Sequence, residues 1–154
     1  MIKDILDTVF NKANEWHEND MTVFEFNSPY PALKLLYHNY QTWHLIDLYK
    51  TNPEQIQYDS HGILHNKLRN NAIAELDEIF NLFQKETGKY HSETLGDIID
   101  KIIISYIKVL HLPNGENKDC VKKHIEILTT CAEDLFKEMN AGTRKCPVIK
   151  RFKV

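Results

Sequence analysis

Residues 98–112 read IIDKIIISYIKVLHL, and this stretch decides the fold. At about 100° per residue, its apolar side chains cover roughly half of a helix circumference, which is more than one neighbouring helix can bury. A helix of this kind must be covered from two sides. We therefore expect either the central helix of a bundle or a helix whose outer face closes a homodimer, and the breadth of the apolar face favours the dimer.

Four further segments around this stretch show the same 3.6-residue spacing of apolar residues. Ser and Pro between residues 28 and 31 start one helix, Ser92 caps another, and glycines at 88 and 142 end two more. Four of the predicted helices cover residues 2–18, 28–50, 92–112 and 118–141. The remaining one begins between residues 53 and 60 and ends at residue 86. No segment alternates with period two, so we predict an all-α antiparallel bundle of about five helices that forms a single domain over residues 1–154.

The composition limits the classes of function. A chain of 154 residues with 27% charged residues and a formal net charge of -3 has no basic surface of the kind that binds nucleic acid. No run approaches the ~20 apolar residues that cross a bilayer, and the opening MIKDILDTVF carries two acids, unlike a signal peptide. The three cysteines lack C-x-x-C spacing and are expected to be reduced thiols. These features predict a cytoplasmic protein that binds neither nucleic acid nor membrane.

Polar residues interrupt the apolar faces of the second and third predicted helices. His44 and Asp47 lie near the end of one inner face, while His61, His65 and Arg69 lie near the start of the next. Because a short connection makes neighbouring helices antiparallel, the two polar patches should meet. Buried charges are costly unless they are paired, hydrated or bound to a ligand. The predicted pocket is lined by Tyr40, Trp43, His44, Asp47, His65, Asn66, Arg69, Asn70 and Lys108.

Two kinds of metal site are conceivable in this pocket or beside it. His61 and His65, four residues apart, would supply imidazoles for a transition metal together with His44 and Asp47, although the cationic Arg69 one turn further on argues against it. Magnesium is the second possibility. The acids for it would be Glu75, Glu78, Asp97 and Asp100. The sequence TLGDII at 94–99 resembles a stretch of the all-α nucleotide pyrophosphohydrolases, and that resemblance implies Mg²⁺ and nucleotide hydrolysis.

An anionic ligand is the leading prediction. Arg69 and Lys108 would bind a nucleotide or sugar phosphate, with hydrogen bonds from Asn66 and Asn70. His44 would be available for proton transfer, oriented by Asp47. The contrary hypothesis is a noncatalytic interaction module in which Asp47 and Arg69 form a salt bridge that fixes the helix register.

Five short motifs resemble the bacterial domain of unknown function family 4254. They are WHLID (43–47), NKLRNN (66–71), SETLGDIIDK (92–101), IKVLHL (107–112) and FKV (152–154). The family pattern reads W-H-x-x-D, N-x-x-R-N-D, S-E-T-P-G-x-x-I-D-R and L-K-I-x-H, so Asn71 and Leu95 depart from it. The resemblance covers residues 35–154 and implies no particular reaction. It implies that the site residues are Trp43, His44, Asp47, Asn66, Arg69, Asn70, Glu93, Thr94, Gly96, Asp100, Lys101, Lys108 and His111.

Overall fold

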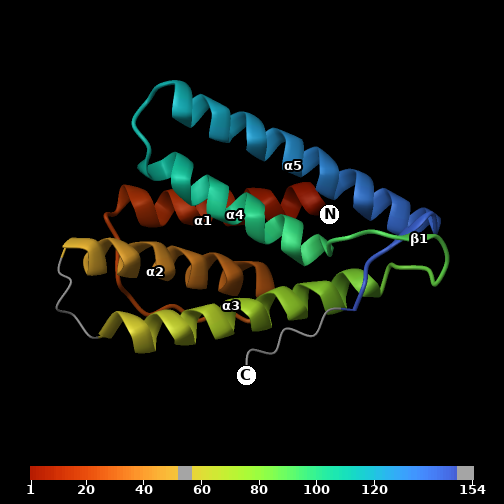
Figure 1. Cartoon of the computed structure of the whole chain (residues 1–154), viewed down its shortest axis with the longest axis horizontal. Helices are drawn as coiled ribbons and strands as arrows, with labels where there is room; N and C mark the ends of the chain where they lie inside the picture. The colour runs from red at the N-terminus through yellow and green to blue at the C-terminus, as the bar shows by residue number, and fades with distance from the viewer. Residues whose placement is uncertain (52–56, 149–154) are drawn as a thin grey trace.

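The structure is a computed structural model that describes residues 1–51 and 57–148, and in residues 57–61 it describes the backbone alone. Figure 1 shows five helices and two short strands. In chain order these are α1 (Ile2–Glu18), α2 (Pro31–Thr51), α3 (Gln57–Asn81), β1 (Lys89–Tyr90), α4 (Leu95–His111), α5 (Glu116–Ala141) and β2 (Arg144–Lys145). The prediction of an all-α fold with five helices is confirmed.

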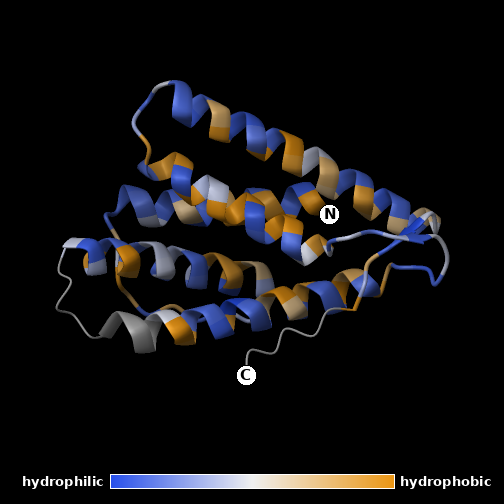
Figure 2. Ribbon diagram, in the orientation of Figure 1, coloured by the Kyte–Doolittle hydropathy of each residue, from blue (hydrophilic) through white to orange (hydrophobic). Residues whose placement is uncertain are grey.

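Helix α4 is the centre of the bundle. It contacts α1, α2, α3 and α5, and Figure 2 shows its hydrophobic segments lying between the surrounding helices. Ile99, Ile102 and Ile103 are completely buried. The broad apolar face that the sequence predicts is therefore covered within the chain, and the reason for expecting a second chain on this face no longer applies. The homodimer itself stays a prediction.

The segment between α1 and α2 is fixed along α2 by side chains of that helix. The Tyr40 hydroxyl donates to the Met21 carbonyl at 2.8 Å, and Gln41 Nε2 donates to the Thr22 carbonyl at 2.8 Å. The Trp16 ring of α1 meets the Phe24 and Tyr40 rings edge to face, at centroid distances of 5.1 and 5.3 Å. This aromatic packing buries the side chain of Trp16 and holds the 21–28 segment against α1 and α2.

Helix α4 begins at a capping box rather than at the predicted Ser92. The Thr94 hydroxyl accepts from the Asp97 amide, while the Asp97 carboxylate accepts from the Thr94 amide. The Gly96 amide donates to Asp77 Oδ1 of α3 at 2.8 Å. A Cβ at position 96 would lie 2.5 Å from that oxygen, so only glycine permits this close approach of α4 to α3.

Helix α3 ends at Asn81, five residues earlier than the predicted end at residue 86. The amides of Leu82 and Phe83 bond to the carbonyls of Ile79 and Phe80, three residues back, which is a tightening turn rather than a continued helix. The apolar character of Leu82 and Phe83 carried the periodic pattern beyond the true end. Leu82 is in fact 82% exposed.

Two short strands that were not predicted from the sequence follow α3 and α5. β1 and β2 pair in parallel, with Lys89 opposite Arg144 and Tyr90 opposite Lys145. A strand of two residues is too short to show a period-two pattern. Within residues 1–51 and 57–148, none of the helices combines the length and the hydropathy needed to cross a membrane.

Candidate functional site

A network of hydrogen-bonded polar side chains lies where α2, α3 and α4 meet. The buried Asp100 carboxylate receives two hydrogen bonds from Arg69, from Nε at 3.0 Å and from Nη2 at 2.7 Å. Asn39 Nδ2 donates to Asp100 Oδ1 at 2.8 Å, and Arg69 Nη1 donates to Asn66 Oδ1 at 3.0 Å. We call these four residues the Arg69 network. It joins one residue of α2, two of α3 and one of α4.

The ion-pair partner of Arg69 is Asp100, and the prediction of Asp47 is wrong. The predicted partner Asp47 is exposed, and in the described part of the chain no hydrogen bond joins it to Arg69 or to His44. Asp100 takes this role because it lies on the buried face of α4, in the middle of an isoleucine run. A lone acid in such a run was the sequence signal that could have identified the pair. Asn39 was missed, since an Asn between aromatic residues gives no comparable signal.

A cavity of about 210 Å³ opens beside the Arg69 network. Its polar surface comes from Asn39, Asn66, Arg69 and Thr42. Its other walls are Trp43, Ile46, Ile104 and Ile107. We call it the Arg69 cavity. It combines an aromatic and aliphatic wall with a few side-chain hydrogen-bonding groups, as ligand pockets commonly do.

A cluster of rings packs next to this cavity. The His111 ring lies 5.2 Å from Trp43, 5.1 Å from His44 and 5.1 Å from His17, measured between centroids. Trp43 Nε1 and His44 Nε2 are buried, and within the described residues neither atom has a hydrogen-bond partner. Burial, reinforced by the neighbouring His111, lowers the pKa of His44 from 6.5 to about 4, although the Asp47 charge opposes the shift. His44 is therefore neutral at pH 7.

Other predicted site residues lie away from the Arg69 cavity. Tyr40 belongs to the core, where its hydroxyl is bound to a backbone carbonyl. Lys108 is exposed and does not line the cavity, and Asn70 does not line it either. Glu93 and Lys101 form an ion pair of their own on the partly exposed side of α4. The residues predicted to line a single polar pocket are thus divided among several separate places in the structure.

The four acids suggested for magnesium do not converge. The Glu75 carboxylate is bound by Lys34 at 3.0 Å and Glu78 is exposed. Asp97 is part of the capping box of α4, and Asp100 is bound by Arg69. Across the described side chains, no group of three or more His, Cys, Asp or Glu is arranged to hold a metal ion. Within TLGDII, Thr94 and Asp97 form the capping box of α4, and the Gly96 amide donates to Asp77 of α3.

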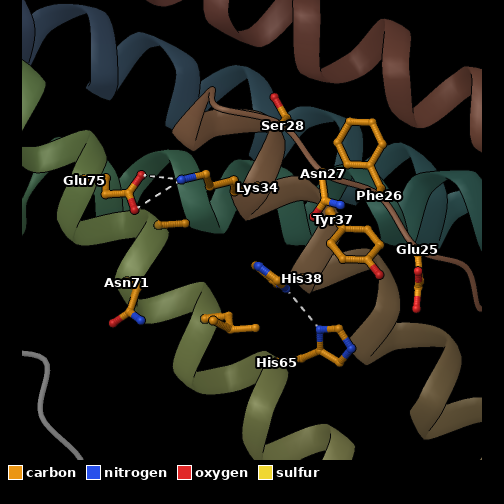
Figure 3. Close-up of a pocket in the computed structure, with 12 residues that line it drawn as sticks. Glu25, Phe26, Asn27, Ser28, Lys34, Tyr37, His38, His65, Asn71 and Glu75 are labelled. Carbon is orange, nitrogen blue, oxygen red and sulfur yellow. Dashed lines mark hydrogen bonds and ion pairs between the residues drawn. The ribbon is translucent and has the colours of Figure 1, made fainter.

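A larger pocket, of about 560 Å³, lies between the 25–28 segment, α2 and α3 (Figure 3). His38 and His65 lie next to each other in its wall, with 3.0 Å between their Nδ1 atoms. The Tyr37 ring lies against both, with its centroid 5.2 and 5.9 Å from theirs. We call this the histidine pocket. Burial, reinforced by His65 and Lys34, lowers the pKa of His38 to about 4.

The sequence analysis placed His65 in a different group. It paired His65 with His61, whose side chain lies outside the described residues, and with His44, which packs against His111 instead. His38 was not identified as a site residue. The sequence did contain a hint, because a His-Asn pair occurs in both helices, at residues 38–39 and 65–66. In each pair the histidine lines the histidine pocket and the asparagine lines the Arg69 cavity.

Comparison with known proteins gives one match. The profile of a family described as "Protein of unknown function (DUF4254)" matches residues 32–148. Neither the curated proteins nor the solved structures contain a match.

Proposed function

Because the chain belongs to the DUF4254 family of proteins of unknown function, its role must be argued from its own residues, and we propose that it binds a small polar ligand in the Arg69 cavity. The observation that carries this proposal is the convergence of Trp43, Asn66 and Arg69 on one cavity. These residues come from two helices and from two of the motifs that resemble the family pattern. Their side chains present one aromatic surface, one amide and one guanidinium to the same space.

The Arg69 guanidinium is held rigidly for this role. Asp100 fixes Nε and Nη2 from behind, and Asn66 accepts from Nη1. A donor that is already oriented loses less conformational entropy when a ligand binds. Its side chain is still 28% exposed, so part of it can be reached from solvent.

The size and charge of the Arg69 cavity narrow the ligand class. A cavity of about 150 Å³ holds a benzene ring, so the 210 Å³ here accommodates a single ring or a short acid, and not a whole nucleotide. The charge of Arg69 is balanced by Asp100, and Lys108 lies outside. The balanced charge limits the ligand to few charged groups. We therefore favour a ring-sized ligand with a single carbonyl, carboxylate or phosphate group, which would stack on Trp43 and accept hydrogen bonds from Arg69 or Asn66.

Binding is better supported than catalysis. His44 does not line the Arg69 cavity, and its Nε2 atom is buried. A general base must reach within hydrogen-bonding distance of the proton that it removes. Proton transfer by His44 would therefore require the ring cluster to rearrange first. We place this binding protein in the cytoplasm, because its thiols are unpaired and those of Cys120 and Cys131 are exposed, as a reducing compartment allows.

Tryptophan fluorescence tests the proposal directly. The chain has two tryptophans, and Trp16 is buried in the core away from the cavity. The probes would be acetate, benzoate, ribose 5-phosphate and inorganic phosphate. We expect at least one organic probe to change the emission of the wild type and of Trp16→Phe, but not of Trp43→Phe. Ile104→Phe, which fills the cavity, should weaken binding, while Ile127→Phe on exposed α5 should not. Binding that survives Ile104→Phe would overturn the proposal.

A structural role for the Arg69 network is the second candidate. It is favoured by one observation, namely that hydrogen bonds from Arg69 and Asn39 already occupy both oxygens of the buried Asp100 carboxylate. In that case the network fixes the register of α2, α3 and α4, and the chain acts as a noncatalytic interaction module. None of the organic probes would then bind, whereas breaking the pair would still lower stability.

A further inference from the structure

The histidine pocket has a function of its own. We propose that His38 and His65 form a two-imidazole site for a divalent transition-metal ion, bound through the two Nδ1 atoms and open toward the pocket. This site is separate from the Arg69 cavity. His38 comes from α2 and His65 from α3, and Figure 3 shows their rings directed at each other between the two helices.

The separation of the two nitrogens suits a particular coordination geometry. Bonds from imidazole nitrogen to a metal are about 2.0–2.1 Å long, so two nitrogens 3.0 Å apart subtend roughly 95° at the ion. This is close to the angle between neighbouring ligands in octahedral and square-planar sites. A tetrahedral ion would need the nitrogens further apart. The spacing therefore favours Ni²⁺ or Cu²⁺ over Zn²⁺.

The charged side chains around the two imidazoles favour the binding of a cation. The charge of Lys34 is balanced by its 3.0 Å ion pair with Glu75, and Glu25 adds a carboxylate at the pocket wall. The charged side chains that line the pocket thus sum to net negative when both histidines are neutral.

Binding through both Nδ1 atoms requires that neither of these nitrogens carries a proton. Without metal, one Nδ1–H donates to the other Nδ1. When metal binds, that ring changes tautomer and its proton moves through water from Nδ1 to Nε2. Both Nδ1 lone pairs then face the ion.

The described residues supply two of the ligands, and among their side chains no third His, Cys, Asp or Glu completes the set. The remaining coordination positions face a pocket of about 560 Å³. Water or an anion in the pocket would fill them. A site of this kind resembles catalytic metal sites in keeping positions open for exchange, whereas structural sites are closed by protein ligands.

Calorimetric titration with Ni²⁺ tests the proposal. We expect one ion per chain, and Zn²⁺ should bind more weakly. His38→Ala and His65→Ala should each weaken Ni²⁺ binding by at least about 10–100-fold, the cost of removing even an outer-shell partner of a metal site. His124→Ala is the matched control, because His124 lies on the exposed face of α5. It should leave the affinity unchanged.

A second measurement does not depend on the folding of variants. In the wild-type protein, paramagnetic Ni²⁺ should broaden the amide resonances of residues 34–38 and 65–72 before those near the ring cluster at His111. Equal binding of Ni²⁺ to the His38→Ala/His65→Ala protein would overturn the proposal, because the ion would then be held by other groups. Tighter binding of Zn²⁺ than of Ni²⁺ would overturn it as well, since the geometry would not be the one that the 3.0 Å spacing dictates.

Discussion

Replacing Arg69 by methionine should lower stability much more than an ordinary surface substitution. Methionine has a similar length and a good helix propensity, so Arg69→Met removes the charge with little loss of volume or of helix stability. Asp100 is 4% exposed and would lose two of its three hydrogen bonds, keeping only the one from Asn39. An uncompensated buried charge of this kind costs about 3–5 kcal/mol.

The expected cost lies at the lower end of this range. The Arg69 side chain is 28% exposed, so some water can reach the space that it vacates. We therefore expect a loss of about 3 kcal/mol, which corresponds to roughly 6–12 °C in melting temperature for a chain of this size. Asp100→Asn should cost less, about 1–2 kcal/mol, because Arg69 can turn toward solvent. The double variant should be more stable than the sum of the two losses predicts.

Urea denaturation followed by circular dichroism would measure these differences. The matched control is Lys34→Met, which breaks the ion pair that joins Lys34 of α2 to Glu75 of α3. Its side chains are 35% and 43% exposed, so its loss should stay within about 1 kcal/mol. The reasoning would be refuted if Arg69→Met cost no more than Lys34→Met, because the pair would then be solvated rather than buried.

Three further changes have expected outcomes. Burial and neighbouring histidines lower the pKa of His38 and His44 to about 4, so the unfolded chain binds protons that the folded chain does not. The free energy of unfolding should fall as the pH drops from about 6.5 to about 4, and less so in His38→Gln/His44→Gln, as urea midpoints at about pH 7.5 and about pH 4.5 would show. Gly96→Ala forces a Cβ to within 2.5 Å of Asp77 Oδ1 and should cost about 1–3 kcal/mol in the same assay, whereas an unchanged midpoint would show that the helices can separate freely. Trp43→Phe removes a buried N–H without a partner and should change the melting temperature by less than about 3 °C, so a larger drop would reveal a hydrogen bond to ordered water.

Much of the fold could be predicted because helix periodicity and helix ends are local properties of a sequence. The predicted helix at residues 2–18 agrees with α1, and Gly142 ends α5 in a left-handed conformation with φ of 79°. The end of α3 was placed too late because the apolar pattern continues into a turn. The two short strands could not be predicted, since their pairing depends on where α3 and α5 end in space.

The candidate site was predicted less well for a physical reason. A helical wheel indicates which residues share a face, but it does not say which neighbouring helix that face meets. Arg69 was correctly identified as an inward charge, yet its partner comes from α4 and not from α2. His38 was overlooked because one histidine on a mostly apolar helix is usually a satisfied core residue. Its importance comes from His65, which is 27 residues away.

The central position of α4 also determines when the chain can fold during its synthesis. Helices α1, α2 and α3 all contact α4, whose buried isoleucines complete the core and which begins only at Leu95. Until α4 has left the ribosome, more than half of the chain exposes hydrophobic surface to other nascent chains and to chaperones. Fragments that stop before residue 95 should therefore aggregate instead of forming an independent three-helix unit. Pausing of translation just before α4 would be harmful, whereas pausing within α5, after α4 is complete, would be tolerated.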